Sequence, residues 1–443
     1  MEQMGVADAL TVKGFSRAAV DDLAAAREEP QWLRAWRHAA WETYEALPMP
    51  TRQDEDWRRT DIRGLELSQY TPVLGNGRVD AALVPALRPL ATRAEDLAGL
   101  LVQQDGALAA RELLDTLAAQ GVLLTTLEAA VREHGELVRR YLGSVVPAAA
   151  NKFAALNAAC WNAGSFVYVP AGVEVALPLA TLQWQESAGA ALLPRTLVVL
   201  ERGASLTLIA DLRSNDQEVA AFHNGVVELY VGEGARLRYV GLQRWGRHVW
   251  NFTTERAVLS REARLEWVVG ALGARLTKTY IQAELREPGA TARLVGVVYG
   301  DAAQHFDHHT LQEHVAHHTA SDLLFKTALK DRARSVFVGL IRVHKTAQQT
   351  DSYLANRNLL LSNTAKADSI PKLEIEANDV RCTHGATVSP VDPEQLFYLR
   401  TRGLSAEEAE RMIVAGFFEP ILEEIPAESV RERLRAAIAA KMA

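Results

Sequence analysis

The sequence predicts a mainly β protein, a stacked parallel β-helix with a helical region at each end. Between about residue 150 and residue 390, stretches such as SFVYVPAGVEVALPL and SLTLIADL show the period of two that is typical of β-strands. A weak repeat recurs in the same part of the chain. No helix of convincing length separates the strands, so βαβ units are disfavoured, and a β-sandwich is the alternative architecture.

Short turn-like motifs carry the repeat. They read GASL, GARL, EARL and GAT, and they start at Gly203, Gly234, Glu262 and Gly289. Successive starts are 27 to 31 residues apart, a period typical of solenoid proteins, in which each coil stacks on the next. We therefore expect the β-helix core to cover residues 150–390.

Residues 1–149 are expected to form a helical N-terminal region. Apolar residues recur at steps of three and four, the spacing of an amphipathic helix, in the stretches 17–47, 110–120 and 125–142. Three tryptophans of this region, Trp32, Trp36 and Trp41, are expected to pack into a small helical core.

Helical signals return in a C-terminal region, residues 391–443. The stretch PEQLFYLRTRG ends at Gly403, a typical residue just past a helix end. Ser405 and Glu408 have the spacing of a capping box that opens the next helix, and Pro426 is expected to start the last one.

The helix after Ser405 presents a broad apolar face. Its members are Met412, Ile413, Phe417, Phe418, Ile421 and Leu422. Part of this face must pack on the core, and the rest is a candidate surface for a partner protein, with Met412, Phe417 and Phe418 as the contact residues.

Composition excludes several classes of protein. With 48% hydrophobic and 23% charged residues among 443, the chain is expected to be globular and long enough for two or three domains. A net charge of −7 provides no basic surface field for nucleic acid. We find no signal peptide and no run of 18 apolar residues, so we expect a cytoplasmic protein without a membrane segment.

Half of the twelve histidines lie between His305 and His318. On a strand, His305, Asp307 and His309 would share one face, which is a plausible ligand set for a transition metal. The HExxH motif is absent, because Glu313 directly precedes His314. Polar runs along a solenoid face more often form hydrogen-bonded ladders, and we favour that interpretation over a metal-dependent enzyme that uses this cluster.

Cys382 and His384 form a sharper candidate site. At positions i and i+2 of a strand, both side chains point to one face, about 7 Å apart. A tetrahedral metal needs four donors, so any site here would need ligands from another chain. The alternative is a buried cysteine beside a hydrogen-bonded histidine. The other cysteine, Cys160, lies far away in sequence, which leaves no disulfide framework or CxxC motif.

Several motifs of nucleotide and hydrolase chemistry are missing. The sequence contains no GxxxxGK[ST], no GxGxxG after a strand and no GxSxG. We therefore expect no ATP hydrolysis by a P-loop mechanism in this chain, and the motif inventory favours a protein that is not an enzyme.

Four stretches resemble the SufB/SufD family of iron–sulfur cluster assembly proteins. They are GVLLTTLEAAVREHGELVRRYLG, NKFAALNAACWNAGSFVYVPAGVEVALPL, the run from TDSYLANRNLLLS through DVRCTHGATVSPVDPEQLFYLRTRGLS, and AGFFEPIL. The resemblance implies a right-handed parallel β-helix between helical ends. It also implies a scaffold subunit in a complex with a SufC ATPase, which would supply the missing P-loop and dock on the C-terminal helices.

Details of the resemblance favour a SufD-like chain. CTHGAT is the SufD form of its motif, LPMPTRQDEDWRRTDI also looks like SufD, and Asn356 stands where SufB-like chains carry a cysteine thought to hold the nascent cluster. The resemblance implies that His384, with Cys382 in the same motif, faces a SufB-like subunit. A transient iron–sulfur cluster or iron would be shared there, and reduced flavin is a further candidate cofactor of the complex.

A β-helix that ends near residue 390 would leave unpaired backbone groups on its last strands, which proteins normally cover or pair. We therefore predict a dimer through the strands of residues 340–390, heteromeric in the cell or homomeric in isolation.

Overall fold

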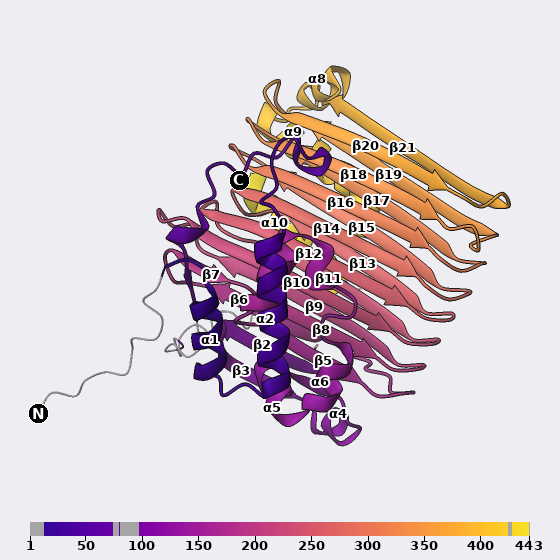
Figure 1. The fold of residues 1–443 in the computed structure, drawn as a ribbon. Helices are drawn as coiled ribbons and strands as arrows, with labels where there is room; N and C mark the ends of the chain where they lie inside the picture. Colours follow the sequence, from indigo (N-terminus) through magenta and orange to yellow (C-terminus); the bar gives the residue numbers. More distant parts are fainter. Residues whose placement is uncertain (1–12, 74–78, 80–96, 424–427, 443) are drawn as a thin grey trace, which may run out of the picture.

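The computed structural model describes residues 13–73, 79, 97–423 and 428–442, and two long sheets dominate it (Figure 1). One sheet has eleven strands and the other ten, and nearly all strand pairs are parallel. In spatial order, the eleven-stranded sheet contains β4 (Leu123–Thr126), β5 (Ser165–Val169), β8 (Arg195–Leu200), β10 (Ala221–Val231), β12 (Val249–Leu259), β14 (Leu276–Leu285), β16 (His305–His314), β18 (Arg334–Val343) and β20 (Lys366–Ile375), with β7 (Ala190–Leu192) and β1 (Thr71–Pro72) at its side.

The ten-stranded sheet lies against it and uses the alternate strands. In spatial order they are β3 (Ala107–Leu113), β2 (Gly99–Gln104), β6 (Leu179–Gln185), β9 (Ser205–Ser214), β11 (Arg236–Arg244), β13 (Arg264–Ala271), β15 (Thr291–Gly300), β17 (Ala320–Leu329), β19 (Thr350–Leu360) and β21 (Val380–Pro390). Because consecutive strands alternate between the sheets, each coil contributes one strand to each sheet. The predicted parallel β-helix is confirmed, and the β-sandwich alternative is wrong.

The sequence repeat marks the coils. The first residues of β9, β11, β13 and β15 are aligned in register, and each is the third residue of its turn motif. Gly203, Gly234 and Gly289 have φ values of 68°, 64° and 75°, and Glu262 adopts the same left-handed conformation at 54°. Glycine reaches this region without steric cost, which explains why it recurs at this step of the coil.

The N-terminal region corrects one prediction. A helix over residues 110–120 is wrong, because β3 and the short helix α4 (Asp115–Ala119) occupy that stretch. β2 and β3 pair antiparallel around a two-residue turn, Asp105-Gly106, with φ values of 45° and 80°. An Asp-Gly pair is a strong hairpin signal, and here it outweighs the helical spacing of the residues that follow.

Helices from the N-terminal region cover the eleven-stranded sheet (Figure 1). They are α1 (Arg17–Ala26), α2 (Gln31–Ala46) and α7 (Lys152–Cys160), while α5 (Leu127–Glu133) and α6 (Gly135–Tyr141) lie at the first end of the solenoid, and single 3₁₀ turns occur at Glu55–Trp57, Leu67–Gln69 and Ala148–Ala150. Trp41 packs with Phe153 and Phe252, so the tryptophans join the helices to the sheet and do not form a separate helical core.

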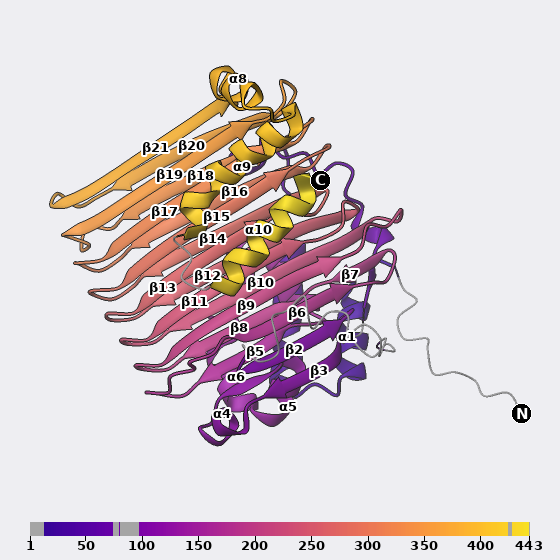
Figure 2. The ribbon, with the colours of Figure 1, turned by 180° about the vertical axis from the view of Figure 1, so that it is seen from behind.

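Two C-terminal helices, α9 (Ala406–Glu423) and α10 (Glu428–Met442), cover the opposite sheet, and α8 (Pro393–Thr401) lies beyond the end of β21 and packs against α9 (Figure 2). Gly403 has φ 94° just beyond α8. The capping box is present, since the Glu408 amide donates to Ser405 Oγ at 3.2 Å and the Ser405 amide donates to Glu408 Oε2 at 2.8 Å. Pro426 lies outside the described residues.

Among the helices described, none is both long and apolar enough to cross a membrane.

Candidate functional site

The last coil of the solenoid leaves an open end. β20 and β21 are the terminal strands of their sheets in the described chain, so each has one edge without a strand partner (Figure 1). The backbone N–H and C=O groups along such an edge need partners, and an uncovered strand edge is a template for pairing with another chain.

Cys382 and His384 lie on β21 at this open end. In the register with β19, Ser352 pairs with Cys382 and Leu354 pairs with His384. Leu354 is fully buried among the inward-facing residues of the solenoid. Because stacked residues of a parallel pair point the same way, Cys382 and His384 both face inward and are about 7 Å apart along the strand. The predicted shared face is therefore present.

The two side chains differ in their surroundings. Cys382 is half-buried against the interior apolar cluster, and burial, followed by the Asp351 carboxylate, raises the pKa of its thiol. This thiol is therefore protonated near neutral pH and is a weak ligand until a metal displaces the proton. His384 is exposed, and no described residue forms a hydrogen bond or ion pair with its imidazole. Its ring nitrogens are available to a ligand from outside the chain.

Asn356 lies one coil below this pair and is fully buried. It pairs in register with Ala386, two residues beyond His384, and so points into the same interior. Its Oδ1 accepts a hydrogen bond from Asn358 Nδ2 at 2.7 Å, and its Nδ2 donates to the Phe325 carbonyl at 3.4 Å. The amide is thus satisfied within the chain and presents no thiolate.

Exposed apolar side chains surround the open end. Leu373 and Ile375 of β20 and Val388 of β21 continue inward-facing rows, yet 37%, 41% and 45% of their surface is exposed. In earlier coils such positions are buried by the next coil. Exposed apolar side chains beside an uncovered sheet edge favour an interaction with another chain.

The histidine-rich strand β16 forms a hydrogen-bonded ladder. His305, Asp307 and His309 share one face, as expected, but Lys278 lies among them. Lys278 Nζ is 2.7 Å from both Asp307 Oδ2 and His309 Nε2, and it donates to the Asp56 carbonyl at 2.6 Å. A cation at the centre of the set opposes metal binding. The preferred ladder interpretation agrees with this geometry.

The other histidines of this stretch point in different directions. His308 faces the interior, where burial lowers its pKa to about 4. His314 contacts the hydroxyls of Thr319 and Ser321, each at 2.8 Å, and His317 and His318 lie in the turn before β17. In the part of the chain that the structure describes, no group of three or more His, Cys, Asp or Glu side chains is arranged to hold a metal.

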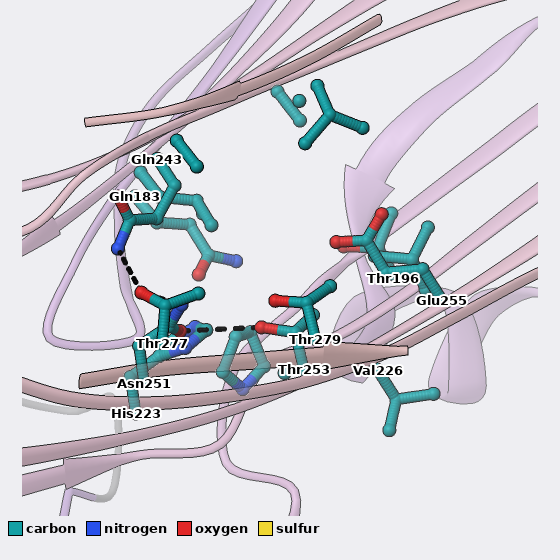
Figure 3. Close-up of a pocket in the computed structure, with 18 of the residues that line it drawn as sticks. Gln183, Thr196, His223, Val226, Gln243, Asn251, Thr253, Glu255, Thr277 and Thr279 are labelled. Carbon is teal, nitrogen blue, oxygen red and sulfur yellow. Dashed lines mark hydrogen bonds between the residues drawn. The ribbon is translucent and has the colours of Figure 1, made fainter. Parts of the chain in front are cut away.

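The solenoid contains a polar chamber (Figure 3). The sequence analysis did not predict this chamber. It is a cavity of about 50 Å³, and inward-facing polar residues of neighbouring coils line it, among them Gln183, His223, Asn251 and Glu255. His223 Nδ1 is 2.6 Å from Asn251 Oδ1, whereas His223 Nε2 and Gln183 Oε1 have no partner among the described residues. Polar lining with unmatched atoms favours ordered water in a cavity of this size.

Aromatic rings fill the interior between this chamber and the open end. The ring of Phe325 lies 5.8 Å from that of His308 and 5.2 Å from that of Phe337, measured between centroids. A Cβ at Gly296 would lie 2.3 Å from Phe325 Cδ1, so the absence of a side chain at Gly296 makes room for this ring. The chamber and the Cys382–His384 pair are therefore separate sites.

Glu255 gives the chamber a testable pH dependence. Burial raises the pKa of its carboxyl from 4.5 to about 7. Between these pH values the folded chain holds a proton that the unfolded chain releases, so the free energy of unfolding falls as pH rises through this range. We expect Glu255→Gln to unfold at a higher temperature than the wild type at pH 8 and to show a flatter pH profile in thermal melts. Glu233→Gln, in an exposed turn, should keep the wild-type profile, and equal profiles for all three proteins would contradict the prediction.

The apolar face of α9 divides between core and surface. Phe418, Ile421 and Leu422 are buried against the sheet, so the prediction that Phe418 contacts a partner is wrong. Met412 is 53% exposed, and Phe417 lies at the edge of a groove of about 690 Å³ between α8 and α9.

Two aromatic residues of α8 extend this surface. Phe397 and Tyr398 are 70% and 57% exposed, and Tyr398 lines the groove with Met412. We call Phe397, Tyr398 and Met412 the docking face. Two adjacent aromatic residues in a helix of mixed polarity could have indicated this surface from the sequence. The sequence does not show that both side chains point to solvent.

Cys160 belongs to the apolar core and not to the candidate site. It ends α7 and is buried, and burial raises the pKa of its thiol to about 12. Such a thiol behaves as a small apolar side chain.

Comparisons with known proteins cover nearly the whole chain. Residues 183–417 match the SufBD core domain of the SUF system for FeS cluster assembly, and residues 21–180 match the SufBD protein N-terminal region. An iron–sulfur cluster assembly SufBD family protein of Staphylococcus epidermidis is 31% identical over 434 residues, which cover 96% of this chain and 92% of that protein. The iron–sulfur cluster assembly protein SufB of Bacillus subtilis has the same identity and coverage, and a SufBD family protein of Staphylococcus aureus is 30% identical over 431 residues, with 96% and 92% covered. The chain belongs to the SufBD family of iron–sulfur cluster assembly proteins.

Proposed function

We propose that this chain is a SufD-type, non-catalytic scaffold subunit that acts in the cytoplasm. It joins a SufB-like subunit through the open end of its solenoid, and it binds a SufC-type ATPase through the docking face. Nascent iron–sulfur clusters, or the iron for them, are cargo at the subunit interface. The observation that carries the proposal is the position of Cys382 and His384 on the inward face of an uncovered last strand.

The donor count supports a shared site. Cys382 and His384 supply at most two ligands, whereas an iron–sulfur cluster takes four from protein side chains. Asn356 supports the SufD assignment over SufB, because a satisfied amide stands where the cluster-bearing cysteine of SufB-like chains is expected. The cargo must therefore take its remaining ligands from the partner subunit.

Co-purification tests this proposal. The chain is expressed with SufB-like and SufC-like partners and isolated through a tag on this chain, and iron and acid-labile sulfide are measured after anaerobic reconstitution. A stable complex with cluster absorbance supports the scaffold function. Failure to retain either partner would contradict it.

The apolar rim of the open end provides a prediction about assembly. We expect Ile375→Asp to weaken binding of the SufB-like subunit, and any homodimer of the isolated chain, by about tenfold or more, because a charge would be buried in an apolar interface. Light scattering and a titration of the two chains measure this. Val219→Asp, which is exposed and distant in sequence, is the matched control. A wild-type chain that is monomeric and also fails to bind a SufB-like chain would refute the interface.

The docking face provides a second prediction. We expect Met412→Asp to reduce ATPase binding by about tenfold while the solenoid stays folded, since Met412 is largely exposed and exposed apolar residues at interfaces often dominate affinity. Unchanged affinity in a pull-down titration, with Val219→Asp as the control, would place the ATPase elsewhere. A point substitution is preferable to deletion of α9 and α10, because deletion would expose the buried residues of the ten-stranded sheet beneath them.

The competing hypothesis of a metal-dependent enzyme on β16 has no support from the geometry, since Lys278 occupies the centre of its ligand set. Reduced flavin stays a proposed cofactor of the complex, without an assigned site in this chain.

A further inference from the structure

Two adjacent histidines, His317 and His318, lie in the turn between β16 and β17. Both side chains are exposed, and their Nδ1 atoms are 2.7 Å apart. The ring centroids are 4.9 Å apart, and the ring planes meet at 78°. Among the described residues, neither ring has another hydrogen-bond or ion-pair partner. We call these two residues the histidine pair.

The backbone of this turn is held between the turns of neighbouring coils. The His318 amide donates to the Gln348 carbonyl in the next coil at 3.0 Å. Thr346 Oγ1 donates to the Val315 carbonyl at 2.7 Å. On the other side, the Val315 amide donates to the Leu285 carbonyl at 3.1 Å. The histidine pair therefore projects from a fixed backbone, which reduces the entropy lost when both rings bind one ligand.

His318 occupies a position of the coil that favours glycine. Its φ is 57°, and Gly289 has a φ of 75° at the matching position of the preceding coil, two residues before the aligned pair Thr291 and Ala320. Gly289 shows that the turn forms without a side chain at this position. A bulkier residue in the left-handed region is uncommon, and such residues gather at ligand-binding sites.

The separation of the two Nδ1 atoms fits a shared metal ion. With metal–nitrogen bonds of about 2.0 Å, two ligands at a right angle have nitrogens about 2.8 Å apart, whereas two tetrahedral ligands have nitrogens about 3.3 Å apart. The observed 2.7 Å corresponds to neighbouring positions on an octahedral or square-planar ion. Among divalent ions that bind imidazole, Ni²⁺ and Cu²⁺ favour such geometries.

The protons of the histidine pair can make way for a metal. In the metal-free chain one Nδ1 donates to the other, so one ring carries its proton on Nδ1. A neutral imidazole can carry its proton on either nitrogen, and moving this proton to Nε2 leaves both Nδ1 lone pairs available. The histidine pair can therefore bind a cation as two neutral ligands.

We propose that the histidine pair is a two-ligand site for a divalent transition-metal ion of the Ni²⁺ or Cu²⁺ type, with water in the remaining positions. Positions filled by water leave the ion open to exchange with ligands from outside the chain. The site uses neither Cys382 nor His384, and it does not depend on the proposed scaffold function.

The test uses an untagged full-length chain that carries Cys382→Ala and His384→Ala, so that the open end supplies no metal ligands. We call this protein the reference chain. Ni²⁺ and Cu²⁺ are titrated by calorimetry, with Mg²⁺ as the control ion because it prefers oxygen ligands. Electron paramagnetic resonance of the Cu²⁺ form reports the number of bound nitrogens. We expect one saturable site per chain, two bound nitrogens and no saturable binding of Mg²⁺.

Further substitutions in the reference chain locate the ion. His317→Ala should weaken Ni²⁺ binding at least about tenfold, because loss of a direct ligand costs no less than loss of an outer-shell partner. His318→Gly should have the same effect and keep the fold, since glycine suits the φ of this position. His344→Ala is the matched control, because it removes a partly exposed histidine from the next turn, and it should bind like the reference chain.

Absence of saturable Ni²⁺ and Cu²⁺ binding to the reference chain would overturn the proposal. Equal affinities of the reference chain, His317→Ala and His318→Gly would also overturn it. A loss in His344→Ala as large as that in His317→Ala would place the ion elsewhere in these turns, and a Cu²⁺ spectrum with a single bound nitrogen would exclude a shared ion.

Discussion

Replacing His384 by alanine is expected to give a folded complex that holds on the order of tenfold less iron–sulfur cluster than the wild type. The imidazole is exposed and has no partner among the described residues, so its removal leaves no buried group unsatisfied. Stability should therefore change little, while the shared ligand set loses a donor. Iron and acid-labile sulfide per complex, together with cluster absorbance, measure the effect.

Two variants separate this result from unspecific damage. His317→Ala removes an exposed histidine in the turn before β17 and should leave cluster content unchanged. Cys382→Ala should lower cluster content less than His384→Ala does, because the raised pKa of the Cys382 thiol keeps it protonated. Normal cluster content in the His384→Ala complex would mean that Cys382 and His384 serve packing only.

The solenoid was predictable because its signals are local and repeated. A turn residue with positive φ recurs at each coil, and the period of two orients the strand residues between these turns. The β2–β3 hairpin was not predicted, because residues 110–120 have helical spacing and the hairpin signal of Asp105-Gly106 just before them was not weighed against it.

The sequence was sufficient to place Cys382 and His384 on one strand, but not to place that strand in the fold. The spacing of Cys382 and His384 placed both on one face, but whether that face pointed inward, and whether another coil covered it, depends on the end of the sheet. The same limit applies to Phe418, whose burial follows from how α9 rotates on the sheet. Lys278 is 29 residues before Asp307 in sequence, so its position in the β16 ladder follows only from the coil register.

Pairing between neighbouring coils also buries an ion pair, between Arg195 of β8 and Glu228 of β10. Both side chains are fully buried, and Arg195 Nη2 is 2.6 Å from Glu228 Oε1. Glu228 Oε2 also accepts the backbone N–H groups of Val145 and Val146, at 3.1 and 3.0 Å. The Glu228 carboxylate therefore binds both the Arg195 guanidinium and the backbone of the segment that leads into α7.

Glu228→Ala is expected to lower the free energy of unfolding by about 3–5 kcal/mol, because it leaves the Arg195 guanidinium buried without its counter-charge and removes the acceptor of three backbone N–H groups, those of Gly143, Val145 and Val146. Urea unfolding of the isolated chain, followed by circular dichroism, measures this loss. Glu233→Ala removes an exposed glutamate just after β10 and should change stability by less than about 0.5 kcal/mol. A loss below about 1 kcal/mol for Glu228→Ala would show that water reaches Arg195 in the variant and that the pair contributes little to the docking of residues 143–146.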